Sequence, residues 1–396
     1  MITHLDFELS SICNAGCPVC SRRQYGSYNL FEQTYWKLDD VKRVVGSNLV
    51  KQLKFFQVCG NFGDGMGNPD IVKIAEWVKS NNPKCKFHIS TNGGIGSKED
   101  YKELAKLGVG ITFGIDGYGD KNELYRINAK WDKVYENFTT FAKYSNTPKR
   151  YLRIQFLLWD QTRDQIKLVF DFAKANNVTE LQFLKPFTHT ADYTRAFNMK
   201  GEYTHSLTFT DNSTIHQLIT EEWTSDRFAE LNRLLNDSQL ETLPLVKEKN
   251  QDFKVPIRKR KKYIPRKAVF SADELKKVKS FEKQSCYSYN ADSRFDLTKE
   301  SNNLYITYNR YLMPCCMIPP QYSLDINHST GNETPYQVEI LNSLDELGIE
   351  NFSLKEKTIQ EVYDSDILHR FVYNKFKNNS QFNFCKITCG KCEQLI

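Results

Sequence analysis

Short apolar runs alternate with amphipathic stretches six times along the first half of the chain. The runs typical of strands are residues 3–9, 53–59, 86–90, 109–115, 152–158 and 180–184. Helical periodicity lies between them, at residues 34–50, 70–80, 98–107, 130–144 and 162–176. A strand followed by a helix, repeated in this way, predicts parallel βαβ units and an α/β fold. In a β/α barrel the loops that follow the strands carry the chemistry.

The alternation stops near residue 186. Residues 186–280 are polar and weakly periodic, with one helical pattern at 215–235. Residues 247–283 hold 14 Lys and Arg against 5 Asp and Glu, and they include the run RKRKKYIPRK at 258–267. Such a run is typical of a solvated linker or exposed arm, and an arm that binds phosphates or an acidic partner is the alternative. Nucleic acid is not the partner that we expect.

Length and hydropathy exclude several classes of protein. A chain of 396 residues predicts two or three domains. No apolar run approaches the ~18 residues of a membrane span. The first residues lack the basic and apolar regions of a signal peptide. We therefore expect a cytoplasmic protein that does not enter the membrane.

Eleven cysteines fall into an early cluster and a late group. Without a secretion signal, clustered cysteines indicate metal ligands or reactive thiols. Cys13, Cys17 and Cys20 form a C-x3-C-x2-C pattern directly after the first predicted strand. Three cysteines can hold an iron–sulfur cube and leave one iron free to bind another group. A structural zinc site completed by a distant Cys or His is the alternative.

Four segments in a fixed order give this cluster its context. They are CNAGCPVC at 13–20, FGDGMGNPD at 62–70, STNGG at 90–94 and GIDG at 114–117. In this order the sequence resembles the radical S-adenosylmethionine (SAM) superfamily. The resemblance implies a partial (β/α)6 TIM-like barrel, one [4Fe–4S] cluster and bound SAM. It also implies an enzyme that reductively cleaves SAM to a 5′-deoxyadenosyl radical, which abstracts a hydrogen atom from substrate.

The resemblance also suggests which residues contact SAM. Gly63 and Asp64 stand where the family binds the SAM amino group, although a Glu is usual at position 64. Many relatives have a Ser where this chain has Gly114, so Asn92 or Gln155 is expected to compensate. Asp116 either lines the site or caps a turn, and Arg126 pairs either with the SAM carboxylate or with a surface acid. The candidate SAM contacts are Gly63, Asp64, Ser90, Asn92, Asp116, Arg126 and Gln155.

Two further cysteines lie near the predicted second and third strands. Cys59 ends the second strand, beside the glycine-rich segment. A lone strand cysteine is usually a buried small hydrophobe. The alternative is a catalytic thiol that returns a hydrogen atom to a substrate radical, as an epimerase needs. Cys85 precedes the third strand, at the end away from the cluster, and is expected to be inert.

The last third of the chain contains six cysteines. Residues 305–316, YITYNRYLMPCC, predict a hairpin whose turn contains Asn309 and Arg310, and CKITCGKC follows at 385–392. The order resembles the auxiliary-cluster domains called SPASM and twitch, and it implies a second [4Fe–4S] cluster. A zinc knuckle is the alternative. The implied ligands are Cys286, Cys315, Cys389 and Cys392, with Cys316 and Cys385 as alternates.

These observations predict three parts of the chain. Residues 1–185 form the barrel, 186–280 a bridging region with the basic segment, and 281–396 a small α+β auxiliary-cluster domain. Because the first strand begins at residue 3, we do not expect a leader-peptide-binding domain before it. The expected reaction is modification of a peptide or protein, or oxidation or epimerisation of a small molecule, with a flavodoxin- or ferredoxin-type reductant. The rivals are a zinc-binding, nucleic-acid-associated protein and a radical SAM-like scaffold without catalysis.

Overall fold

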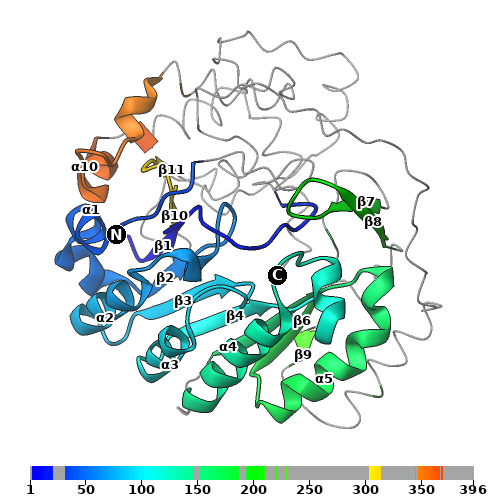
Figure 1. Cartoon of the computed structure of the whole chain (residues 1–396). Coiled ribbons are helices and arrows are strands. Elements are labelled where there is room, and N and C mark those ends of the chain that lie inside the picture. Colours follow the sequence, from blue (N-terminus) through cyan, green and yellow to red (C-terminus); the bar gives the residue numbers. More distant parts are fainter. Residues whose placement is uncertain are drawn as a thin grey trace, which may run out of the picture.

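Six parallel strands, adjacent in chain order, form the centre of the structure (Figure 1). The computed structural model describes residues 2–20, 32–145, 151–184, 186, 193–209, 219–220, 229, 303–313, 344, 347–365 and 367–368. The strands are β1 (His4–Phe7), β2 (Phe55–Val58), β3 (Lys86–Thr91), β4 (Gly110–Gly114), β5 (Leu152–Leu157) and β6 (Glu180–Leu184). Each strand lies within the residue range that predicts it, except β3, which extends one residue beyond its range.

A helix connects each of these strands to the next. The helices are α1 (Leu38–Gln52), α2 (Ile71–Asn81), α3 (Lys98–Lys106), α4 (Trp131–Tyr144) and α5 (Ile166–Ala175). The strand order never reverses, and crossovers between parallel strands are right-handed. All five helices therefore cover the same face of the sheet, as Figure 1 shows. This arrangement is that of a partial (β/α)6 barrel, and it confirms the predicted α/β class.

Short strands from later in the chain extend both edges of this sheet. β10 (Asn303–Ile306) pairs parallel to β1, and β11 (Leu312–Met313) pairs antiparallel to β10. β9 (Ile219–Thr220) pairs antiparallel to β6. The helix predicted over 215–235 is therefore wrong at residues 219–220, because the open edge of β6 offers them backbone partners. The hairpin predicted at 305–316 is confirmed over its described part.

The turn of the β10–β11 hairpin contains an arginine in a conformation that favours glycine. Arg310 has φ 72°, and its side chain donates to Asp40 of α1 at 2.8 Å and lies 5.1 Å from the centre of the Trp36 ring. These contacts offset the cost of the left-handed backbone. The hairpin is thereby fixed to the barrel, and the predicted division at residues 185 and 280 stays a prediction.

The remaining described elements are short. β7 (Tyr193–Phe197) and β8 (Tyr203–Thr208) form a separate antiparallel pair. Three 3-10 turns lie within the barrel, η1 (Gly65–Gly67), η2 (Gly119–Leu124) and η3 (Asp160–Gln165). A fourth, η4 (Ile349–Phe352), precedes α10 (Ile359–Asp364), which begins with a capping box between Thr358 and Glu361. No helix in the described ranges has both the length and the apolar character needed to cross a bilayer.

The two faces of the parallel sheet differ in polarity. The face under the helices is apolar, and its aromatic rings stack from Phe7 through Phe56 to Phe87 at 5.7 and 5.0 Å. The inner face, opposite the helices, is polar, although the interior of a closed barrel is usually filled by branched apolar side chains. Its alternating positions include Asp6, Gln57, His88, Ser90, Thr112, Arg153, Gln155, Glu180 and Gln182. This polar face ends at the loops that follow the carboxyl ends of the strands.

Candidate functional site

The three early cysteines lie on one loop at the carboxyl end of β1. Cys17 is buried, Cys13 and Cys20 are half-buried, and none of them forms a disulfide. Asn14 fixes the loop, since its Nδ2 donates to the carbonyls of Gly94 at 3.1 Å and Asn128 at 3.2 Å. The structure therefore brings the cysteine loop onto the loops that follow β3 and β4, as the parallel arrangement predicts.

The glycine-rich segment after β2 packs directly against the start of the cysteine loop. A Cβ on Gly63 would lie 2.1 Å from the carbonyl oxygen of Ser10, and one on Gly67 would lie 2.4 Å from that of Ile12. The backbone N–H of Asp64 donates to the same Ile12 oxygen at 2.9 Å. Only glycine permits this approach of two backbones. The segment singled out by its resemblance is thus in contact with the chain that leads into Cys13.

Asp64 joins the loops after β2 and β3 through their backbones. Its side chain is 3% exposed, and its two oxygens accept from the N–H of Met66 at 2.9 Å and of Asn92 at 2.7 Å. Burial raises the pKa of this carboxyl, and the backbone hydrogen bonds oppose that rise. Both oxygens are thus engaged by loop amides, so Asp64 holds the site together. Direct contact of its side chain with SAM stays a prediction.

Asn92 connects the third loop to the cysteines. Its Nδ2 donates to the Oδ1 of Asn14 at 3.0 Å and lies 3.4 Å from the Sγ of Cys13, while its Oδ1 accepts from the N–H of Gly94 at 2.7 Å. Ser90, on the inner face, accepts from the Nε2 of Gln57 at 3.2 Å. Asn92 thus lies beside the cysteine loop, whereas Ser90 lies further down the strand.

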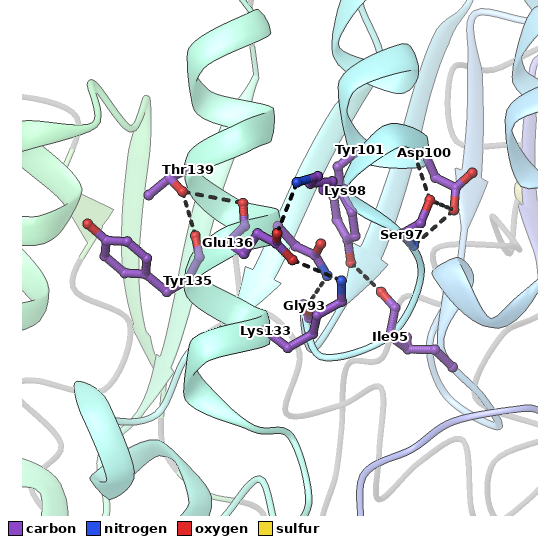
Figure 2. Close-up of polar contacts among 11 residues, drawn as sticks. Gly93, Ile95, Ser97, Lys98, Asp100, Tyr101, Lys133, Tyr135, Glu136 and Thr139 are labelled. Carbon is purple, nitrogen blue, oxygen red and sulfur yellow. Dashed lines mark hydrogen bonds and ion pairs between the residues drawn. The ribbon is translucent and has the colours of Figure 1, made fainter.

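The helices support this third loop from behind. Asn137 of α4 donates to the carbonyl of Gly93 at 2.8 Å, and the hydroxyl of Tyr101 of α3 donates to that of Ile95 at 3.0 Å. Figure 2 shows the contact between Tyr101 and Ile95, and it shows Glu136 between Lys98 and Lys133 where α3 and α4 meet. The loop that presents Asn92 is therefore held on both sides.

Asp116 and Arg126 form a buried pair after β4. The Nε of Arg126 donates to one oxygen of Asp116 at 2.5 Å, and the N–H of Leu157 donates to the other at 2.6 Å. Burial alone would lower the pKa of Arg126, but the charges of Asp116 and Cys17 raise it above its usual value. Arg126 therefore lies beside the cysteine loop with its Nε bound to Asp116. Its pairing with the SAM carboxylate stays a prediction.

The position of Arg126 explains the glycine at position 114. A Cβ on Gly114 would lie 2.4 Å from the Nη2 of Arg126, so the guanidinium fills the space that a serine side chain would need. Gln155, offered as the compensating residue, donates to the Oε1 of Gln182 on the neighbouring strand at 2.9 Å. The amide of Asn122, rather than Asp116, closes the following turn by accepting from the N–H of Asp116 at 3.0 Å.

The two isolated cysteines differ in their surroundings. Cys85 is fully buried, and burial raises its pKa to about 11, so the thiol is protonated near neutrality. Cys59 follows β2, is half-buried, and packs against the core while its N–H donates to the carbonyl of Phe7 at 2.9 Å. The inert role of Cys85 fits its burial, and a catalytic role for Cys59 stays a prediction.

Three residues of the site, Glu8, Tyr305 and Asn14, were not predicted from the sequence. Glu8 is fully buried and accepts from the hydroxyl of Tyr305 on β10 at 2.6 Å. Asn14 lies between Cys13 and Cys17 in the cysteine loop. A signal for Glu8 is present, because Asp6 and Glu8 place acids on alternate positions of a buried strand, which directs both to the inner face. Nothing in the sequence signals that Tyr305, nearly 300 residues away, joins them.

The remaining site predictions concern the metals. Cys286, Cys315, Cys316, Cys385, Cys389, Cys392 and the basic run at 258–267 lie outside the described residues. Within the described part, no group of three or more His, Cys, Asp or Glu side chains is close enough to hold a metal ion. The donor chemistry of the first loop nevertheless fits an iron–sulfur centre, because its three thiols share a short loop that other loops fix in place.

Comparison with known families agrees with this geometry. Residues 7–173 match the Radical SAM superfamily. This part of the chain is a radical SAM domain. The matched residues contain all four segments of the resemblance and the loops that meet around Cys13. The family implies a [4Fe–4S] cluster and SAM.

Two solved structures are similar to most or all of this chain at low sequence identity. SuiB of Streptococcus suis bound to SAM is 14% identical, with a TM-score of 0.46 over 86% of this chain and 64% of that chain. The chain thus spans less than two thirds of SuiB. Native anSMEcpe with bound SAM is 16% identical, with a TM-score of 0.46 over 100% and 91% of the two chains. No curated protein matches the sequence.

Proposed function

We propose that this chain is an enzyme that reductively cleaves SAM and abstracts a hydrogen atom from its substrate. The observation that carries the proposal is the meeting of three loops of the radical SAM domain, where Gly63 contacts Ser10 and Asn92 contacts Cys13. When bound, the cluster and SAM supply one-electron cleavage to methionine and a 5′-deoxyadenosyl radical, which takes hydrogen from substrate.

The protein's own part in this function is to hold and orient. Cys13, Cys17 and Cys20 would bind three irons of the cluster. Asp64 fixes the glycine-rich segment and the Asn92 loop to each other, so that both present their backbones at the same end of the sheet. A site held in this way loses little free energy to reorganisation when its ligands bind.

The inner face supports a polar substrate. Gln57, Ser90, Gln155 and Gln182 are half-buried there and carry neutral amide and hydroxyl groups. Arg153 and Glu180 neutralise each other at 2.8 Å. Neutral hydrogen-bonding groups of this kind suit a peptide or another neutral polar molecule. Modification of a peptide or protein, or oxidation or epimerisation of a small molecule, is therefore the reaction that we propose.

The proposal includes a reductant protein and a second iron–sulfur cluster. SAM cleavage consumes one electron, so a flavodoxin- or ferredoxin-type protein is the reductant that we infer. A second [4Fe–4S] cluster held by the late cysteines is proposed from their order in the sequence. The cytoplasm is the compartment in which these cofactors and a reductant of this type would be found together.

Anaerobic reconstitution of the protein tests the proposed function. Iron, sulfide and zinc are counted, and 5′-deoxyadenosine is measured after adding dithionite and SAM. We expect the variant Cys13→Ala/Cys17→Ala/Cys20→Ala to hold about four irons fewer than the wild type and to form no 5′-deoxyadenosine. Cys85→Ala is the matched control, because it removes a buried thiol from the other end of the sheet, and it should retain both.

Two outcomes would sink the proposal in different ways. Zinc in place of iron in the wild type would favour the zinc-binding, nucleic-acid-associated protein. A full complement of iron and sulfide without 5′-deoxyadenosine would favour the scaffold without catalysis.

A further inference from the structure

Glu8 is a fully buried carboxylate that the proposed chemistry does not use. It follows β1, and its backbone N–H donates to the carbonyl of Ile306 at the end of β10 at 2.8 Å. Its side-chain oxygens accept from the backbone N–H of Asn61 at 3.0 Å and of Phe62 at 3.4 Å. Glu8 therefore binds two consecutive amides of the loop that enters the glycine-rich segment.

The β10–β11 hairpin contacts this same loop from the other side. The hydroxyl of Tyr305 donates to Glu8 at 2.6 Å and accepts from the Nδ2 of Asn61 at 3.3 Å. The rings of Tyr308 and Phe62 lie 5.4 Å apart and form a small apolar cluster of their own. Side chains from the far end of the sequence thus hold both residues that precede Gly63.

A displacement of this loop would reach the SAM segment directly. Asn61 and Phe62 are followed at once by Gly63, whose backbone leaves no room against Ser10, and by Asp64, whose oxygens are both engaged. A tightly packed segment of this kind moves as a unit. The positions of residues 61 and 62 therefore set the positions of residues 63 and 64.

We propose that Glu8 and Tyr305 are a positioning pair through which the β10–β11 hairpin holds the glycine-rich loop in the conformation that binds SAM. The inference rests on the proposed function, since it assumes that residues 63 and 64 meet SAM. It assigns to the strand β10, which lies outside the matched residues 7–173, a part in the cofactor site.

The chain offers a matched pair at the opposite end of the sheet. The hydroxyl of Tyr151 donates to Glu180 at 2.8 Å, and Glu180 is 6% exposed. Tyr151 precedes β5 and Glu180 begins β6, so this pair lies at the amino ends of the strands. It has the same tyrosine-to-carboxyl hydrogen bond as Tyr305 and Glu8, with Arg153 as a further partner of Glu180, and it lies away from the loops of the site.

Equilibrium dialysis of SAM against the anaerobically reconstituted full-length protein tests the proposal. We expect Tyr305→Phe to raise the Kd of SAM about three- to tenfold, which corresponds to the net contribution of one ordinary hydrogen bond. Glu8→Gln should raise the Kd of SAM by a similar factor. The –NH2 group of the glutamine would replace one carboxyl oxygen, so the backbone N–H that donates to that oxygen would lose its acceptor. Tyr151→Phe and Glu180→Gln should leave the Kd within about twofold of the wild type.

Stability and turnover complete the test. The rate of 5′-deoxyadenosine formation is measured against SAM concentration. If the pair positions the loop, Tyr305→Phe raises the KM for SAM in this reaction but leaves kcat at saturating SAM close to that of the wild type. Its thermal unfolding midpoint should fall no further than that of Tyr151→Phe. Equal SAM affinity in all four variants and the wild type would overturn the inference while leaving the proposed function intact. Failure of the wild type itself to bind SAM would overturn both.

Discussion

The two ends of the parallel sheet use buried polar groups in different ways. At the amino ends, side chains pair with side chains of the next strand, as when Tyr151 and Arg153 both donate to Glu180 at 2.8 Å. At the carboxyl ends, Glu8, Asp64 and Asn92 bind the backbones of loops. The first arrangement stabilises strands that the sheet already aligns. The second helps to fix loops that the ladder hydrogen bonds of the sheet do not reach, and those loops contain the site.

Substitution of glycine at each end should separate these roles most sharply. In Gly63→Ala the new Cβ would lie 2.1 Å from a backbone oxygen, so the glycine-rich loop and the cysteine loop must move apart. We expect a loss of about 3 kcal/mol in the free energy of unfolding and no measurable SAM binding. Urea unfolding and dialysis of SAM measure the two effects.

Gly108→Ala is the counterpart at the amino end. Gly108 has φ +66°, and the space that an added Cβ would enter has no other atom within 4 Å, so the cost of alanine comes from the backbone alone. We expect about 1 kcal/mol of destabilisation and unchanged SAM affinity. If Gly63→Ala bound SAM as Gly108→Ala does, the close approach of the two loops would have no bearing on the cofactor.

Asp64→Asn should have the next largest effect. The asparagine keeps the size of the side chain but turns one acceptor into a donor that faces the N–H of either Met66 or Asn92. One buried amide then loses its partner, and we expect about a tenfold weaker SAM affinity with a loss of about 1–3 kcal/mol in stability.

Thr112→Val provides the comparison for this variant. It removes a buried hydrogen bond of 2.8 Å between Thr112 and His88 on neighbouring strands, away from the loops. The stability loss should be similar and the SAM affinity unchanged. Equal affinities in the two variants would mean that the Asp64 bridge contributes only to stability.

The extent to which the sequence predicts this structure depends on how local each sequence pattern is. The strands and helices of the barrel were predicted within a few residues, because each strand places buried residues such as Phe56 and Val58 at alternate positions. The convergence of Cys13, Gly63 and Asn92 was also predictable, since loops after parallel strands meet at one edge. The pairing of β10 with β1 was not, because about 300 residues separate Leu5 from Leu304 and no local pattern records it.

The departures from the family pattern show the same limit. Gly114 was predicted to need a compensating residue for SAM. The structure instead shows the guanidinium of Arg126 beside it, and that contact depends on the turn through η2. A residue type at one position can be explained only when its spatial neighbour is known.

The remaining effect that we predict concerns the pH dependence of stability, and its sign differs between the two ends of the sheet. Burial raises the pKa of Glu8 from 4.5 to about 7, although its hydrogen bonds to Tyr305, Asn61 and Phe62 oppose the rise. Between pH 4.5 and 7 the folded state keeps a proton that the unfolded state has lost, so Glu8 lowers stability as the pH rises. Burial, together with Arg153, lowers the pKa of His88 from 6.5 to about 3. Between pH 6.5 and about 3 the unfolded state therefore holds a proton on His88 that the folded state lacks, so His88 lowers stability as the pH falls below 6.5.

Urea unfolding at pH 5, 6.5 and 8 distinguishes the two contributions. Relative to the wild type, Glu8→Gln should gain about 1–3 kcal/mol as the pH rises from 5 to 8, because the glutamine has no proton to lose. Asp6 lies near Glu8, and burial raises its pKa to about 6, so a smaller dependence of the same sign should remain. His88→Gln should gain about 1–2 kcal/mol between pH 6.5 and 5. Parallel pH profiles for Glu8→Gln and the wild type would mean that Glu8 stays ionised in the fold. Tyr305 would then donate to a charged carboxylate throughout this range, and Glu8 would contribute no pH dependence to the SAM affinity.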